Sequence, residues 1–210
     1  MRPADFEIKR MVYALFIPLM LVILLWLILL FEWGMDIDLY RLGIYPRQKG
    51  GWIGIITSPL VHANVKHLFS NTISLLVLSW GLFYFYTDLG YKIFPLLWLL
   101  SGFITWSIGR ESWHVGASGV IYALAFFLFL SGILRKYIPL MSISLIVVFL
   151  YGSMVWSIFP FTELIRENIS WEGHLSGAIS GMVCAVIFRN YGPQKPEEEE
   201  EEEEDGEEES

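Results

Sequence analysis

Long uncharged stretches alternate with short polar segments along this 210-residue chain. The first, Met11 to Phe31, has 21 residues, enough to cross a hydrocarbon core of ~30 Å at about 1.5 Å per residue. Further apolar stretches cover residues 61–86, 91–108, 116–133, 138–158 and 173–188. Together they predict an all-α membrane protein, in which a polar lead (1–10) precedes one six-helix bundle (11–190).

The connection between the first two apolar stretches, residues 32–58, is rich in glycine, proline and charge. It is therefore too polar to span a bilayer. Its aromatic residues are the kind that gather at the lipid headgroups: Trp33, Tyr40, Tyr45 and Trp52. We expect a long first loop that lies in the membrane interface.

Composition supports a membrane location. The chain is 55% hydrophobic with a mean hydropathy of +0.52, and only 17% of its residues are charged, against about a quarter in soluble domains. Acidic residues fill 12 of the last 14 positions, so the formal charge of −8 belongs to the tail. Residues 191–210 are predicted to be a disordered acidic tail, which either binds an unknown partner or is simply solvated.

Basic residues suggest the orientation. A cytoplasmic N-terminus places eight on the inner side (Arg2, Lys9, Arg10, Lys92, Arg135, Lys136, Arg189, Lys195) and six outside (Arg41, Arg47, Lys49, Lys66, Arg110, Arg166). The excess of two favours a cytoplasmic location for both termini. The first apolar run is too long for a signal peptide. A single cysteine, Cys184, excludes an intramolecular disulfide and a cysteine metal cluster.

One serine lies among small residues at the start of an uncharged helix, in Gly116-Ala117-Ser118-Gly119. Small neighbours let another backbone approach the hydroxyl closely, which suits a nucleophile. The alternative is that these residues pack helices together and that Ser118 caps the helix, as small residues in membrane helices commonly do.

All four histidines, His62, His67, His114 and His174, lie at or inside the expected membrane depth, where ionisable groups usually mark function. His174 heads a stripe of small residues that shares one helix face: Gly177, Ala178 and Gly181. If this stripe packs on Gly119 and Ala123, then Ser118 and His174 meet at the same end of two helices.

A serine–histidine pair of this kind performs acyl transfer, because a neutral imidazole takes the hydroxyl proton. Glu172 is two residues from His174 and points off the shared face, so we expect it at the interface. The sequence therefore predicts a Ser118–His174 dyad rather than a triad.

Two polar residues of the second apolar stretch, His67 and Asn71, are four apart and share one helix face. With the Ser118 amide they offer donors to the oxyanion of a tetrahedral intermediate. Tyr122, one turn after Ser118, is placed to stack under His174. The alternative role of each of these side chains is a contact between helices.

Taken together, these motifs resemble the rhomboid family of intramembrane serine proteases over roughly residues 10–190. The matching stretches are His62-x4-His67-x3-Asn71, Gly116-Ala117-Ser118-Gly119 with Tyr122, and His174-x2-Gly177-x3-Gly181. The resemblance implies Ser118 as nucleophile and His174 as base. It also implies His67, Asn71 and the Ser118 amide as the oxyanion hole, Tyr122 as a support for His174, and His62 as a structural residue.

The resemblance further implies a six-helix bundle with a water-filled cavity open to the outside and a mobile fifth helix that admits substrate. Rhomboids cut single-span membrane proteins near the outer end of the span and need no cofactor. One departure concerns the first loop, where many rhomboids carry Trp-Arg: here Trp52 is followed by Ile53. The general pattern assigns no role to His114.

Two rival functions remain open. One is a catalytically inactive relative that binds membrane proteins, although such relatives lack the serine or the histidine. The other is a transporter that uses His62, His67 and His174, although the spans hold no internal carboxylate to act as a relay. The His-Glu-x-x-His motif of metalloproteases is absent. We expect the lipid bilayer and transmembrane substrates as partners, and neither a metal nor a nucleic acid.

Overall fold

Helices make up nearly all the regular structure of the computed structural model, which describes residues 3–150, 158 and 170–193. The longer helices are α1 (Pro3–Met35), α3 (Val65–Ile108), α4 (Ser118–Arg135), α5 (Ile138–Leu150) and α7 (Trp171–Ile187). The first loop holds shorter turns: η1 (Tyr40–Leu42), η2 (Gly51–Ile53), α2 (Gly54–Thr57) and η3 (Ser58–Leu60). The prediction of a helical bundle is confirmed for this part of the chain.

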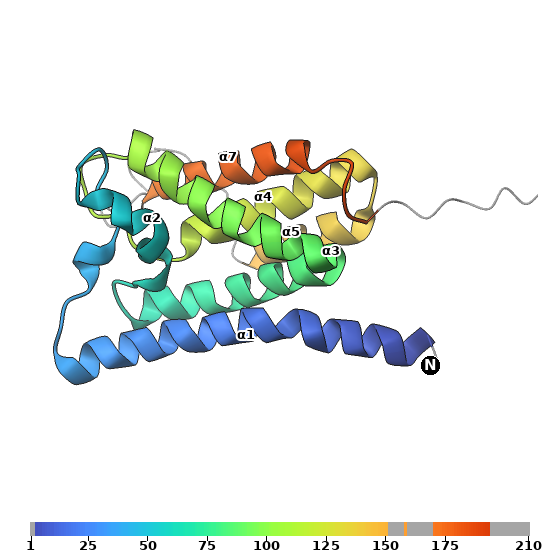
Figure 1. Ribbon diagram of the computed structural model, residues 1–210, viewed down its shortest axis with the longest axis horizontal. Helices are drawn as coiled ribbons and strands as arrows, with labels where there is room; N and C mark the ends of the chain where they lie inside the picture. The colour runs from blue at the N-terminus through green and yellow to red at the C-terminus, as the bar shows by residue number, and fades with distance from the viewer. Residues whose placement is uncertain (1–2, 151–157, 159–169, 194–210) are drawn as a thin grey trace, which may run out of the picture.

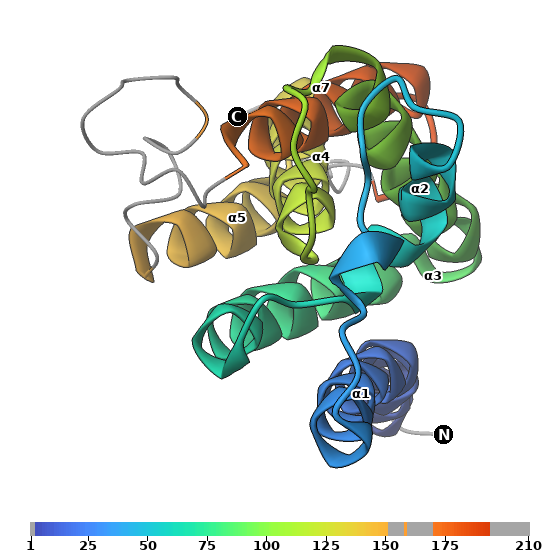
Figure 2. The same cartoon turned by 90° about the vertical axis from the view of Figure 1, so that its left-hand side faces the viewer.

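Helix α4 forms the centre of the bundle. It packs against α3, α5 and most extensively α7, and its face toward them carries fully buried side chains such as Leu124, Phe127 and Leu128. Helix α1 lies on the outside, against α3 (Figures 1 and 2). Because α4 begins at Ser118, this arrangement places the candidate serine at one end of the most enclosed helix.

Helix α3 consists of two arms. Thr87 has the non-helical angles φ 41° and ψ −117°, which reverse the chain so that the arms run antiparallel (Figure 1). The arms correspond to the second and third predicted spans. The first arm begins at Val65 rather than near Val61, because the extended Asn64 caps it by accepting a hydrogen bond from the His67 amide at 2.9 Å.

Three helices of the described chain are long and apolar enough to cross a membrane: α1, α3 and α4. The count of six spans stays a prediction. Helix α7 has 17 residues, and the expected fifth span is described only as α5 and Ile158. The rest of that span (151–157) and most of the predicted tail (194–210) lie outside the described residues.

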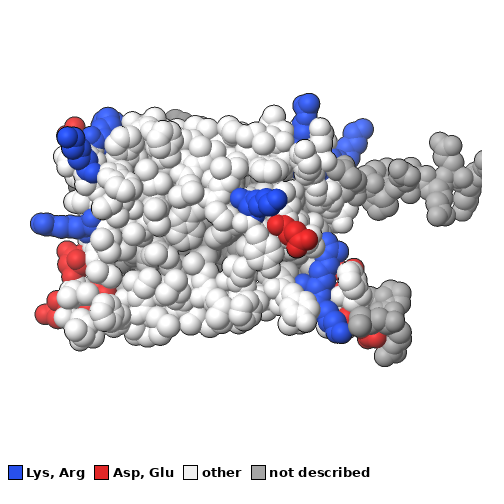
Figure 3. Space-filling model, in the orientation of Figure 1, with Lys and Arg blue, Asp and Glu red and all other residues white. Residues whose placement is uncertain are grey.

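The surface is banded by charge. On the face shown in Figure 3, basic and acidic side chains gather at the two ends of the long axis and leave a broad uncharged belt, broken by one basic and acidic pair. Many large apolar side chains are exposed on the protein surface; Phe16 of α1, for example, is 63% exposed. An uncharged belt with exposed apolar residues indicates an integral membrane protein.

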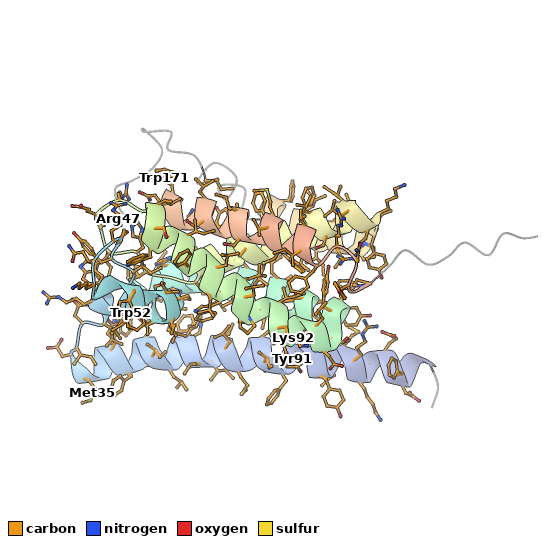
Figure 4. All side chains as sticks on the ribbon, turned by 45° about the horizontal axis from the view of Figure 1, so that its top comes forward. Met35, Arg47, Trp52, Tyr91, Lys92 and Trp171 are labelled. Carbon is orange, nitrogen blue, oxygen red and sulfur yellow. The ribbon has the colours of Figure 1, made fainter. Side chains whose placement is uncertain are left out.

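The first loop is anchored without a Trp-Arg pair. The backbones of Ile44 and His114 exchange two hydrogen bonds of 2.8 and 2.9 Å, and the Arg47 amide donates to the carbonyl of Trp106. The indole of Trp98 reaches the carbonyl of Ile56 at 3.0 Å. The loop and the start of α7 lie at the same end of the bundle, as Arg47, Trp52 and Trp171 show in Figure 4.

A buried arginine holds the opposite end together. Arg135, 6% exposed at the end of α4, donates to the Tyr86 hydroxyl at 2.5 Å and to the carbonyls of Phe188 and Tyr191. One side chain thus ties the first arm of α3 and the chain after α7 to the central helix.

We expect Arg135→Met to lower the free energy of unfolding by about 2–3 kcal/mol, because it leaves a buried hydroxyl and two carbonyls without their donor. Thermal unfolding of the purified protein in detergent measures this change. Lys136→Met is the matched control, since Lys136 is the exposed neighbour. Equal unfolding temperatures for the two variants would contradict the prediction.

Candidate active site

The two residues expected to form the dyad lie together. Ser118 is the first residue of α4, and His174 lies in the first turn of α7. The Nε2 atom of His174 is 3.0 Å from the Oγ atom of Ser118, within hydrogen-bonding reach. His174 is only 9% exposed. The pair has the geometry of a nucleophile beside its general base.

Local backbone geometry places Ser118 at the very start of α4. The sequence suggested a helix from Gly116, but Gly116 has φ +106°, which keeps it outside the helix. Ala117 occupies the capping position, and its methyl side chain makes no capping hydrogen bond. The alternative in which Ser118 acts as the helix cap is therefore wrong, and its hydroxyl points to His174 instead.

Small residues let α4 and α7 approach closely enough for this contact. A Cβ atom on Gly177 would overlap the carbonyl oxygen of Gly119, and one on Gly181 would overlap that of Ala123. Gly119 itself faces the backbone of Gly173. The structure confirms the prediction that the small-residue stripe of α7 packs on α4.

Tyr122 lies directly against the imidazole of His174. The two rings are nearly parallel, at an interplanar angle of 14° and a centroid distance of 4.4 Å. Tyr122 is one turn after Ser118 on α4, so the helix that presents the serine also presents a flat surface for the base. This contact restricts rotation of the imidazole.

The residues expected to form the oxyanion hole surround the backbone just before Ser118. A Cβ on Gly116 would lie 2.5 Å from Cε1 of His67 and 3.5 Å from Nδ2 of Asn71. The amides of the first turn of α4, including that of Ser118, have no partner within the helix. Two polar side chains of α3 thus lie against the backbone at Gly116, two residues before the serine.

His62 holds Asn71 and the loop in place. Its Nε2 atom accepts from Asn71 Nδ2 at 3.1 Å and from the Ala117 amide at 3.4 Å. Burial, with a smaller contribution from nearby His67, lowers the pKa of His62 to about 3. The ring is therefore neutral at physiological pH, which is the form in which Nε2 accepts both hydrogen bonds.

A cavity opens beside Ser118. Its lining includes five hydroxyl side chains: Ser58, Ser101, Thr105, Ser118 and Ser170. About 30 Å³ is open to the centres of water molecules, and a single water needs roughly 10–15 Å³. The cavity is therefore large and polar enough to hold water next to the candidate nucleophile.

Three residues near the start of α7 differ from the expectation: Glu172 was expected elsewhere, and Ser170 and His114 had no assigned role. Glu172, expected at the interface, is 2% exposed, and its Oε1 lies 3.5 Å from Nε of Arg110. Ser170 caps α7 and contacts His114, which is 4% exposed. A serine just before an apolar helix is a recognised capping signal, but no local signal pairs residues 110 and 172.

A comparison with known protein families identifies the region that contains these site residues. A family model described as the Rhomboid domain matches residues 49–191, more than half of the chain. The chain belongs to the rhomboid family. It is thus a rhomboid integral membrane protein with a helical bundle, and its Ser118 and His174 lie inside the matched region.

Individual relatives of this rhomboid protein include Uncharacterized protein Mb1372 of Mycobacterium bovis, 38% identical over 156 residues. Uncharacterized protein ML1171 of Mycobacterium leprae is 35% identical over 141 residues. The alignments cover 69% and 64% of this chain but only 62% and 55% of those relatives. Putative rhomboid protein L523 of Acanthamoeba polyphaga mimivirus is 30% identical over 146 residues, which are 65% of this chain and 75% of that protein.

Proposed function

We propose that this rhomboid protein is an intramembrane serine endopeptidase. The observation that carries the proposal is the 3.0 Å contact between Ser118 Oγ and His174 Nε2 in a partly enclosed site. Support comes from the polar donors around Gly116 and from the cavity beside the serine. The substrates are single-span membrane proteins, cut near the outer end of the span, and no cofactor takes part.

The chemistry follows from the positions of the atoms. As Ser118 Oγ attacks the scissile carbonyl carbon, His174 Nε2 takes its proton, and the Ser118 amide, His67 and Asn71 donate to the oxyanion. His174 then returns the proton to the leaving amine, and the C–N bond breaks. Water from the cavity hydrolyses the acyl-enzyme by the same two proton transfers.

The proposal includes an orientation. Helix α4, whose first residue is Ser118, begins at the end of the bundle that holds the first loop, opposite the N-terminus of α1 (Figure 1). With both termini in the cytoplasm of a prokaryotic cell, the dyad faces the outer side of the plasma membrane. A substrate span would then present the peptide bonds near its outer end.

A fluorophosphonate probe tests the proposal, because an activated serine displaces fluoride from phosphorus and becomes covalently labelled. The purified protein in detergent is compared with Ser118→Ala and His174→Ala. We expect labelling at Ser118 that is lost in both variants. No labelling of a folded wild-type sample would overturn the proposal and favour an inactive relative that binds membrane proteins.

Asn71→Ala is expected to lower kcat by about 10²–10³-fold with KM nearly unchanged, since one oxyanion donor is lost while others remain. Initial rates of substrate cleavage in detergent measure this effect. Asn190→Ala, an exposed asparagine beyond α7, serves as the control. A complete loss of activity together with unfolding would instead assign Asn71 a structural role.

A further inference from the structure

The loop between α3 and α4, residues 109–117, makes two side-chain contacts with the start of α7. The first involves His114, which is buried and has both ring nitrogens in hydrogen bonds. Its Nδ1 lies 2.6 Å from Oγ of Ser170, and its Nε2 lies 3.1 Å from the carbonyl oxygen of Arg110. The histidine therefore joins its own loop to the residue that precedes α7.

Ser170 connects His114 to the first turn of α7. Its Oγ accepts from the Gly173 amide at 3.1 Å, and its carbonyl accepts from the His174 amide at 3.2 Å. One protonation state satisfies the whole chain of contacts: His114 Nε2–H donates to the carbonyl of Arg110, and Nδ1 accepts from the Ser170 hydroxyl. Burial lowers the pKa of His114 and so favours this neutral form.

The second contact is an ion pair. Arg110, on the same loop, reaches Oε1 of the buried Glu172 at 3.5 Å. Glu172 is the second residue of α7, where a negative charge also interacts favourably with the positive end of the helix dipole. His174 lies two residues further on.

This loop is continuous with the nucleophile. Ser118 follows it directly, and the backbone of His114 pairs with Ile44 of the first loop. Residues 109–117 therefore contact the start of α7, which carries His174, and lead directly into Ser118. This matters because proton transfer needs a separation of roughly 2.6–3.2 Å, and a shift of about 1 Å can cost about 10²-fold in rate.

We propose that His114, acting through Ser170, is a positioning residue that holds the first turn of α7 so that His174 stays within hydrogen-bonding distance of Ser118. The Arg110–Glu172 pair is the second support of the same turn. The proposal rests on the proposed function, in which Ser118 and His174 are the catalytic residues.

Three substitutions of His114 separate its two hydrogen bonds. In His114→Asn, the amide oxygen takes the position of Nδ1 and keeps the acceptor for Ser170. In His114→Gln, the amide nitrogen takes the position of Nε2 and keeps only the donor to Arg110. His114→Ala removes both, and Glu111→Ala, an exposed neighbour in the loop, is the control.

We expect kcat, and the rate of fluorophosphonate labelling at Ser118, to fall by about 10-fold to 100-fold in the Ala and Gln variants. KM stays near the wild-type value. In the Asn variant, kcat and the labelling rate stay within about 3-fold of wild type. Rates are normalised to folded protein. Amide hydrogen exchange of the peptide spanning Ser170 to His174 should become faster in the Ala and Gln variants only.

The proposal is overturned if the Ala and Gln variants label at the wild-type rate, if the Asn variant falls as far as Ala, or if lost activity merely follows the unfolded fraction. A wild-type protein that fails to label would refute the proposed function instead. In that case hydrogen exchange still reports whether His114 secures the start of α7, so the two failures are distinguishable.

Discussion

Replacing Ser118 by alanine is expected to reduce cleavage of a membrane-protein substrate by at least about 10³-fold while the protein stays folded. The substitution removes the hydroxyl oxygen that lies within reach of His174 and attacks the scissile carbonyl in the proposed mechanism. Its structural cost is one hydrogen bond, worth about 1 kcal/mol, because the packing of α4 on α7 depends on glycines and not on this hydroxyl.

The measurement is the initial rate of cleavage of a fluorescent single-span substrate in proteoliposomes. Ser107→Ala is the matched control, since that serine donates to the carbonyl of Phe103 within its own helix. Because nucleophile and base act as a unit, adding His174→Ala to Ser118→Ala should lower the rate no further. Cleavage by Ser118→Ala at the rate of the control would remove the basis of the proposed mechanism.

The sequence predicted those parts of the site that follow from helical periodicity. His174, Gly177 and Gly181 recur on one face, and so do His67 and Asn71, so the residue spacing alone places each set on its helix. The contact between the faces also followed, because stripes of small residues allow helices to approach each other. Periodicity thus brought Ser118 and His174 together across 56 residues.

The sequence did not predict the contacts that depend on loops. Glu172 was expected at the interface because it points away from His174, yet it is buried, and Arg110 from a different loop lies beside it and offsets part of the cost of that burial. His114 had no assigned role because its partners, Ser170 and Ile44, are 56 and 70 residues away. Such pairings depend on the path of each loop, and the periodicity of helical residues gives no information about that path.

Gly177→Ala is the second substitution from which we expect a large effect. The new methyl group would overlap the carbonyl oxygen of Gly119 and lie 2.9 Å from Cβ of Tyr122. Neither atom can rotate away, because one belongs to the backbone and the other is fixed to it. The helices must therefore separate, and we expect the free energy of unfolding to fall by about 1–3 kcal/mol.

The rate of cleavage should also fall, because Gly177 lies one turn after His174 and Gly119 directly follows Ser118. Separating α4 from α7 by about 1 Å would move His174 out of reach of Ser118 and cost about 10²-fold in kcat. Gly34→Ala is the control: it is the same change in a helix, and among the described residues no atom lies within 4 Å of the added carbon. In α1 the substitution should stabilise the protein by about 0.5–1 kcal/mol, since alanine favours helix. If both variants have the same unfolding temperature and cleavage rate, close glycine packing is not what holds Ser118 and His174 together.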